Sequence, residues 1–188
     1  SLENAGIWEG GWKILLYFNM FFIAPFSIYY FPRFSKSKKI NETKLLLYKS
    51  IKFNLPLLIL ASFVIIIFKE YIIKLLFTKD FADISKFLNY ILIGECFRII
   101  GIFIQHTYLA KVKVYNVIIF DIIFFSIFVL LSYFSIGEFG LKGVGVSYII
   151  SSLIFLTAYT ICFYSIDPFK KGISCFIEVL ISSLLSFG

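Results

Sequence analysis

The chain has 188 residues, of which 60% are hydrophobic, and its mean hydropathy is +0.94. A water-soluble domain of this length cannot bury so much apolar surface in one core, so the composition excludes a soluble protein and predicts an integral membrane chain. The formal net charge of +7 does not indicate a nucleic-acid partner, because the basic residues gather in one set of predicted loops and no DNA- or RNA-binding pattern is present.

Five segments are apolar enough to cross a bilayer, which takes about 20 residues of helix. In chain order they cover residues 13–31, 53–68, 87–110, 115–136 and 144–165. A sixth apolar stretch, residues 173–187, holds Glu178 and fits a full span, a partial span, an interfacial helix or a frayed tail. The predicted fold class is therefore all-α, a polytopic transmembrane helix bundle of five to six spans.

The first span begins beside two tryptophans. Lys13 follows Trp8 and Trp12, and both residue types commonly anchor a helix at the membrane interface. That interpretation stands beside a second one, in which Lys13 contacts a substrate. Pro25, in the middle of the span, predicts a kink because proline removes a backbone hydrogen bond.

Two further features mark the ends of later spans. Residues 69–77, KEYIIKLLF, fit either a continuation of the second helix to the outer interface or a short amphipathic helix lying on it. Four glycines between the last two spans predict a tight outer turn and then a small-residue face for close helix packing: Gly137, Gly140, Gly143 and Gly145. The many tyrosines and phenylalanines are expected to face lipid for the most part.

The third span, residues 87–110, carries a polar stripe in an otherwise apolar helix. At 100° per residue, with Glu95 at zero, His106 falls at about +20°, Arg98 at about −60° and Gln105 at about −80°. Ionisable groups in hydrocarbon are costly and occur mainly where they line a protein interior or a pathway. The stripe is therefore predicted to face protein, with the opposite side facing lipid.

Glu95 and Arg98 lie three residues apart, so they can pair on one helix. Either the pair only fixes helix packing, or Arg98 binds an anionic substrate while Glu95 takes up a proton or an ion. A guanidinium suits phosphate because it donates two parallel hydrogen bonds. Arg98 lies about 16 Å into the span, near the bilayer centre, where alternating-access transporters place their substrates.

Two more ionisable residues complete the candidate site. Asp121, about seven residues into the fourth span, could meet Arg98 or His106, as a packing charge or as a coupling group. His106 is the only histidine and is interpreted as an interfacial hydrogen-bonding group rather than a proton relay. No metal is expected, because zinc would need three or four ligands and Cys96, Cys162 and Cys175 sit singly in apolar runs. No cofactor is expected, and no enzyme signature is present.

Basic residues alternate between the predicted loops and set the orientation. The loops after the first, third and fifth spans hold eleven: Arg33, Lys36, Lys38, Lys39, Lys44, Lys49, Lys52, Lys111, Lys113, Lys170 and Lys171. The other loops hold five: Lys69, Lys74, Lys79, Lys86 and Lys142. The positive-inside rule places the eleven in the cytoplasm, the start of the chain outside and the end of the fifth span inside.

Several short motifs, in order, resemble a known family. Residues 5–14, AGIWEGGWKI, are similar to an AGxWxxxxK stretch, and residues 30–35, YFPRFS, to an LPxxS element. Leu76 and Phe77 followed by Phe81 resemble an LLFS…F element, and residues 93–98, IGECFR, a GDxxK/R element with Glu95 replacing the usual Asp. The turn at residues 140–145 also fits. These motifs occur in bacterial O-antigen and lipid III (enterobacterial common antigen) flippases, polysaccharide transporters of the multidrug/oligosaccharidyl-lipid/polysaccharide exporter superfamily.

The resemblance implies a fold of about a dozen helices in two lobes around a central cavity. Residues 1–168 would then be most of the C-terminal lobe of a longer protein, and residues 169–188 an unassigned apolar tail on the cytoplasmic side. The implied location is the bacterial inner membrane, with the chain crossing it several times.

The resemblance also implies the function, which is flipping an undecaprenyl-diphosphate-linked oligosaccharide to the periplasmic leaflet for O-antigen or a related polysaccharide. Arg98, alone or with Lys13, would bind the substrate, while Glu95, Asp121 and His106 would balance charge or couple an ion. Membrane lipid and other polysaccharide-assembly membrane proteins are the expected partners. The alternatives are a multidrug/cation antiporter of the same superfamily, a membrane polymerase or ligase of the same pathway, and a structural subunit that transports nothing.

Overall fold

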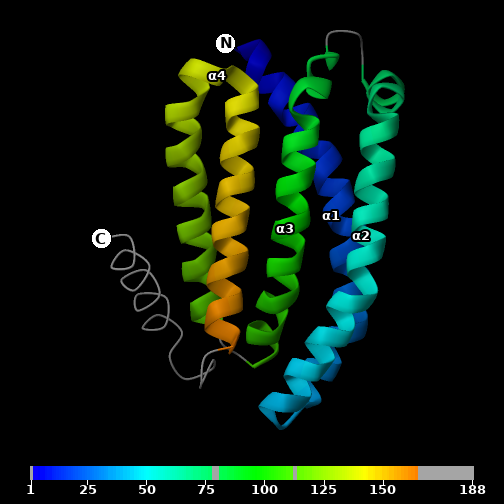
Figure 1. Ribbon diagram of the computed structural model, residues 1–188, viewed down its shortest axis with the longest axis vertical. Coiled ribbons are helices and arrows are strands. Elements are labelled where there is room, and N and C mark those ends of the chain that lie inside the picture. The colour runs from blue at the N-terminus through cyan, green and yellow to red at the C-terminus, as the bar shows by residue number, and fades with distance from the viewer. Residues whose placement is uncertain (1, 78–80, 112–113, 165–188) are drawn as a thin grey trace.

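The computed structural model describes residues 2–77, 81–111 and 114–164, so the apolar stretch at 173–187 lies outside the described residues. The described chain forms four helices: α1 (Leu2–Lys36), α2 (Ile40–Leu76), α3 (Ile84–Ala110) and α4 (Val114–Tyr164). All four are long and apolar enough to cross a membrane, and no strand occurs in these ranges (Figure 1). The predicted all-α transmembrane bundle is confirmed.

The helix α4 consists of two helices that meet at a sharp turn. Gly140 adopts φ 57° and ψ −142°, a backbone conformation that favours glycine. The two arms then run side by side (Figure 1), with the rings of Phe120 and Tyr159 4.5 Å apart between centroids. The Oγ atoms of Ser135 and Ser147 lie 3.1 Å apart near the turn. The outer turn is thus where the glycines place it, and the described chain has five membrane-crossing segments.

The first two helices are longer than the spans predicted from hydropathy. With 35 and 37 residues, α1 and α2 are about 52 Å and 55 Å long, against a hydrocarbon core of about 30 Å. The expectation that Lys44, Lys49 and Lys52 lie in a loop is wrong, because only residues 37–39 connect the two helices. A helix satisfies its own backbone hydrogen bonds, so it can continue into the headgroup region. Residues 69–76 likewise continue α2.

The two ends of the bundle are chemically different. At one end Lys111, after α3, donates hydrogen bonds to the backbone carbonyl of Ser37 and, at 3.1 Å, to its hydroxyl. At the other end the ring of Trp8 stacks on Phe87 at 5.5 Å and on Phe128 at 6.2 Å. Lys36, Lys38, Lys39 and Lys111 lie at the first end, and the positive-inside rule assigns this end to the cytoplasm.

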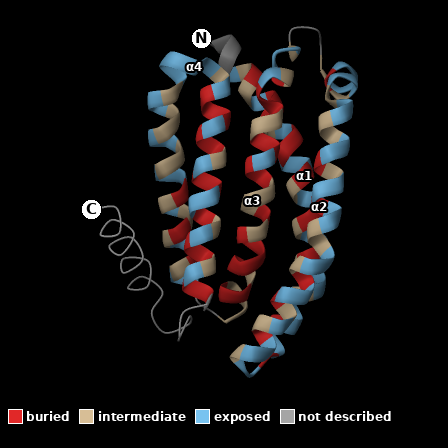
Figure 2. Cartoon of the chain, viewed as in Figure 1, coloured by how far each residue is buried: buried red, intermediate tan, exposed pale blue. Residues whose placement is uncertain are grey.

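The central element is α3, which packs against all three other helices. In its most apolar stretch 61% of the residues are buried, against 11% in α2, and Figure 2 shows this contrast between the two helices. Glycines let the second arm of α4 approach α3 closely. A Cβ on Gly94 would lie 2.7 Å from Cδ1 of Tyr148, and a Cβ on Gly101 would lie 2.7 Å from Cδ1 of Phe155.

Candidate functional site

The polar stripe of α3 faces protein, as its helical spacing predicts, and the other helices divide it. Glu95 is completely buried, and the neighbouring side chains of the stripe are buried or half-buried. The angular spread of the stripe brings Arg98 and Gln105 to the first arm of α4 and His106 to α1. Glu95 lies between these two groups.

Glu95 is held by partners from two helices. Its Oε2 accepts a hydrogen bond from the hydroxyl of Tyr148, on the second arm of α4. Its Oε1 accepts one from Nη1 of Arg98 at 3.4 Å, so the predicted pair on α3 forms. Asn19 of α1 faces the same carboxylate, and the Oδ1 atom of Asn19 is buried without a hydrogen-bond partner among the described residues.

Arg98 is more accessible than its partner. Its side chain is 18% exposed, against 1% for Glu95, and its Cζ atom lies 5.3 Å from the ring centroid of Phe124 on α4. That distance allows a cation–π attraction. The Nε atom is buried and has no hydrogen-bond partner in the described part of the chain. The guanidinium therefore has a donor left for a further acceptor.

Asp121 has a partner that the sequence did not suggest. Both carboxylate oxygens accept hydrogen bonds from Nε2 of Gln105, at 3.1 Å and 3.0 Å. Asp121 also lies within electrostatic range of Arg98. The first arm of α4 packs against α3, as a contact with Arg98 or His106 would require, but a neutral amide rather than either of these residues directly contacts the acid.

His106 lies on the side of the stripe that faces α1. Its Nε2 is 2.9 Å from Oγ of Ser27, and its Nδ1 is 2.8 Å from the backbone oxygen of Ile102. Phe26 and Phe31 form T-shaped contacts with the ring, with centroids 5.6 Å and 6.3 Å away. Both nitrogens thus have a partner, which agrees with an interhelical hydrogen-bonding role and separates His106 from the acid of α4.

Lys13 lies apart from these groups, towards the outer end of α1. It forms an ion pair with Glu9 at 3.0 Å, and both side chains are more than half exposed. Asn19, the residue of α1 that faces Glu95, is six positions further along, which is about 9 Å of helix. In this arrangement Lys13 matches an interface anchor, and the structure does not bring it to Arg98.

Sequence reasoning missed the buried tyrosines, of which Tyr148 contacts Glu95. Tyr108, Tyr148 and Tyr159 are fully buried, so the expectation that the aromatic residues mostly face lipid is wrong for them. A signal was present in the last span, where positions three and four apart alternate along one side of the helix. That side holds Gly145, Tyr148, Ser152, Phe155, Tyr159 and Cys162.

The chemistry available to this cluster is electrostatic. Two carboxylates, Glu95 and Asp121, share the neighbourhood of one guanidinium, so the fully ionised cluster carries one excess negative charge. Uptake of a proton or another cation balances it, and a bound cation in turn favours an anion at Arg98. No group of three or more metal-binding side chains occurs among the residues that the structure describes.

The comparisons with known proteins identify the family. Residues 12–186 match the family described as "Lipid II flippase MurJ". The chain is also 23% identical, over 157 residues, to proteins named "Lipid III flippase" from Escherichia coli (strain K12) and Shigella flexneri. These alignments cover 84% of this chain and 38% of each relative. No solved structure matches the chain.

The chain is part of a multi-pass protein of the bacterial inner membrane. It belongs to the MurJ lipid II flippase family. It spans about 38% of the length of the curated relatives that it matches.

Proposed function

We propose that the chain is part of a flippase that moves an undecaprenyl-diphosphate-linked oligosaccharide from the cytoplasmic to the periplasmic leaflet. One observation carries the proposal: a buried ionic cluster lies on the central helix of this chain, which belongs to a family of flippases. Such a cluster costs free energy in a membrane, and transport of a charged headgroup is a reason to keep it. No covalent chemistry is part of the mechanism.

Arg98 would bind the diphosphate. The partial exposure of the side chain supports this role, because the exposed part of the guanidinium can meet an acceptor outside the bundle. Lys13 would be a secondary contact at the outer end of α1. The prenyl tail would stay in lipid while the headgroup crosses.

Glu95 and Asp121 would couple the movement to an ion. The excess negative charge of the cluster makes cation uptake and headgroup binding mutually favourable, which is the thermodynamic requirement for coupling. His106, within hydrogen-bond distance of Ser27 on α1, would be a further group that can take up a proton and balance charge.

The finer assignments belong to the same proposal. The saccharide would be an O-antigen-type or related surface-polysaccharide unit, and other polysaccharide-assembly membrane proteins would be partners. Residues 1–168 would form most of the C-terminal lobe of a two-lobe transporter. The relatives are named for lipid III, so the saccharide is the part of the proposal that most needs a direct test.

Reconstitution of the full-length protein tests the activity. Proteoliposomes would carry a fluorescent undecaprenyl-diphosphate-linked saccharide, and a membrane-impermeant quencher would report its leaflet. We expect transfer between leaflets that is faster than in protein-free vesicles and that responds to an imposed ion gradient. Leu60→Ala, a change on the exposed face of α2, is the control that should leave transfer intact. Transfer no faster than in empty vesicles would contradict the proposal.

A further inference from the structure

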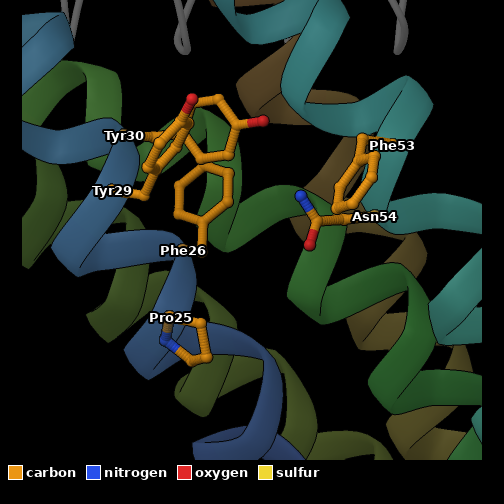
Figure 3. A pocket seen from close by; sticks show the side chains of 6 residues that line it. All are labelled: Pro25, Phe26, Tyr29, Tyr30, Phe53 and Asn54. Carbon is orange, nitrogen blue, oxygen red and sulfur yellow. The ribbon is translucent and has the colours of Figure 1, made fainter.

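A pocket lies between α1 and α2. It has a volume of about 420 Å³ and is lined by Pro25, Phe26, Tyr29, Tyr30, Phe53 and Asn54. In Figure 3 the aromatic rings of α1 lie on one side of the pocket, and Phe53 and Asn54 of α2 lie on the other. The volume falls in the range of about 300–1,000 Å³ that is common for small-molecule sites.

On the α1 side of the pocket, the rings of Phe26, Tyr29 and Tyr30 contact one another and form a corner. The rings of Tyr29 and Tyr30 meet at 83° with centroids 4.8 Å apart, and Phe26 lies 5.1 Å from Tyr30. Phe26 is itself stacked on Phe103 of α3 at 3.9 Å and 7°. The packing on the central helix therefore holds the corner in place before any ligand binds, which reduces the entropy lost on binding.

Hydrogen-bonding groups surround this corner. Nδ2 of Asn54 donates to the backbone oxygen of Ser50 at 2.8 Å, so its Oδ1 remains as an acceptor beside the pocket. The hydroxyls of Tyr29 and Tyr30 form no hydrogen bond with the other described residues. Two phenols and one amide oxygen, set against ring faces, suit a ligand that has both an apolar face and several hydroxyl groups.

The charge around the pocket has one sign. The guanidinium carbon of Arg33 lies 3.5 Å from the ring centroid of Tyr29 and covers one face of that ring. Lys36 follows on α1, and Lys49 and Lys52 lie within two turns of Asn54 on α2. None of the lining residues is acidic. An anionic group attached to the ligand therefore finds complementary charge at this end of the bundle.

From these observations we propose that the pocket binds one saccharide unit of a lipid-linked oligosaccharide on the cytoplasmic side, with its diphosphate beside Arg33. The ring faces pack against the C–H face of the sugar, and the phenols and the Asn54 amide bond its hydroxyls. The identity of the cargo rests on the proposed function, whereas the pocket and its chemistry do not.

The pocket is separate from the Arg98 cluster. It lies between α1 and α2, whereas Arg98 faces α4, and Tyr29 is seven residues, about 10 Å, from the cytoplasmic end of α1 at Lys36. If α1 is centred in the bilayer, Tyr29 lies at the boundary between the hydrocarbon core and the headgroups of the cytoplasmic leaflet. The pocket would thus hold the cargo before its diphosphate reaches the centre of the membrane.

Equilibrium binding to the full-length protein tests the proposal. The protein would be held in nanodiscs that contain phosphatidylglycerol, so that ordinary anionic lipid already competes. The two probes are farnesyl diphosphate and farnesyl-diphosphate-linked N-acetylglucosamine. We expect Tyr29→Leu and Asn54→Leu each to weaken binding of the saccharide probe at least tenfold and to leave binding of farnesyl diphosphate unchanged. Tyr133→Leu, which changes an exposed tyrosine on α4, should alter neither.

Two results would overturn the proposal. Either the variants bind the saccharide probe as tightly as the unmodified protein, or they lose both probes equally, which would make the pocket a phosphate site only. The test is independent of translocation. If Arg98→Ala abolishes transfer and leaves saccharide binding unchanged, the two sites act separately. If the unmodified protein binds the saccharide probe but transfers no lipid, the proposed function fails and the pocket stands.

Discussion

The helices α2 and α3 are both apolar enough to cross a membrane, but their surroundings are opposite. The most apolar stretch of α2 has a mean hydropathy of 2.3 and is 11% buried, whereas that of α3 has a mean hydropathy of 1.8 and is 61% buried. The more hydrophobic helix is thus the more exposed one. In a membrane, exposure to lipid costs an apolar side chain little, whereas a charged side chain needs protein around it.

The comparison separates two kinds of information in the sequence. Hydropathy predicts which segments cross the membrane, and the polar residues within them predict which segment is central. Substitutions on the central, charged helix α3 should therefore change the stability more than substitutions on the exposed, apolar helix α2. The predictions below run from the largest expected effect to the smallest.

Breaking the ion pair on α3 should have the largest effect on stability. Glu95→Leu leaves the guanidinium of Arg98 without its carboxylate, and removing one partner of a buried pair costs about 3–5 kcal/mol. Glu95→Leu combined with Arg98→Leu should recover much of that loss, because two apolar residues replace the pair. Thermal unfolding in nanodiscs measures both. Equal stability of the single variant and the unmodified protein would show that the pair does not hold the bundle.

The next largest effect on stability should come from shortening a buried leucine on α3, and the same change on α2 should have little effect. Leu92 on α3 is completely buried, and Leu92→Ala should cost about 2–4 kcal/mol through lost packing and a cavity. Leu60 on α2 is 62% exposed, and Leu60→Ala should change the stability by less than about 0.5 kcal/mol. Comparable losses in the two variants would mean that the exposed face of α2 is packed against protein in the full-length molecule.

Adding one methyl group tests the close approach of α3 and α4. Gly94→Ala places a Cβ 2.7 Å from Tyr148 and 3.2 Å from the backbone nitrogen of Ile149, so overpacking should cost about 1–3 kcal/mol. Gly137→Ala is the matched control, since a Cβ there meets nothing within 4 Å. The difference in melting temperature between the two variants is the readout, and no difference would contradict the packing described above.

Removing the outer lysine should have the smallest effect on stability. Lys13 and Glu9 form an exposed ion pair, which contributes about 0–1 kcal/mol. Lys13→Met should therefore unfold at nearly the same temperature as the unmodified protein. A modest fall in transfer rate at normal stability would support a secondary substrate contact, and an unchanged rate would leave Lys13 as an interface anchor only.

Much of the fold follows from the sequence alone. The five crossing segments, the turn at Gly140 and the inward-facing stripe of α3 depend on hydropathy, on one glycine and on helical spacing, which are local properties. The length of α2 was underestimated, because Lys44 and Lys52 are polar and a helix can nevertheless carry them into the headgroup region.

The partners of the stripe could not be predicted in the same way. Helical spacing gives the angle between Gln105 and His106 but not which neighbouring helix each one meets. The rotation of each helix about its own axis decides these contacts. It brings Asp121 to Gln105 and His106 to Ser27. Tyr148 was missed because twelve tyrosines offer many candidates, and only packing distinguishes the buried ones.

The central claim is that the charges of α3 serve transport, and Arg98 tests it most directly. Cells would carry the full-length protein with Arg98→Ala or Arg98→Lys at matched protein levels, and lipid-linked repeat units would be assigned to their leaflet. We expect the units to accumulate on the cytoplasmic face and surface polysaccharide to fall, strongly in the alanine variant and partly in the lysine variant. Normal export in both variants would show that the stripe only packs the bundle, and would contradict the account.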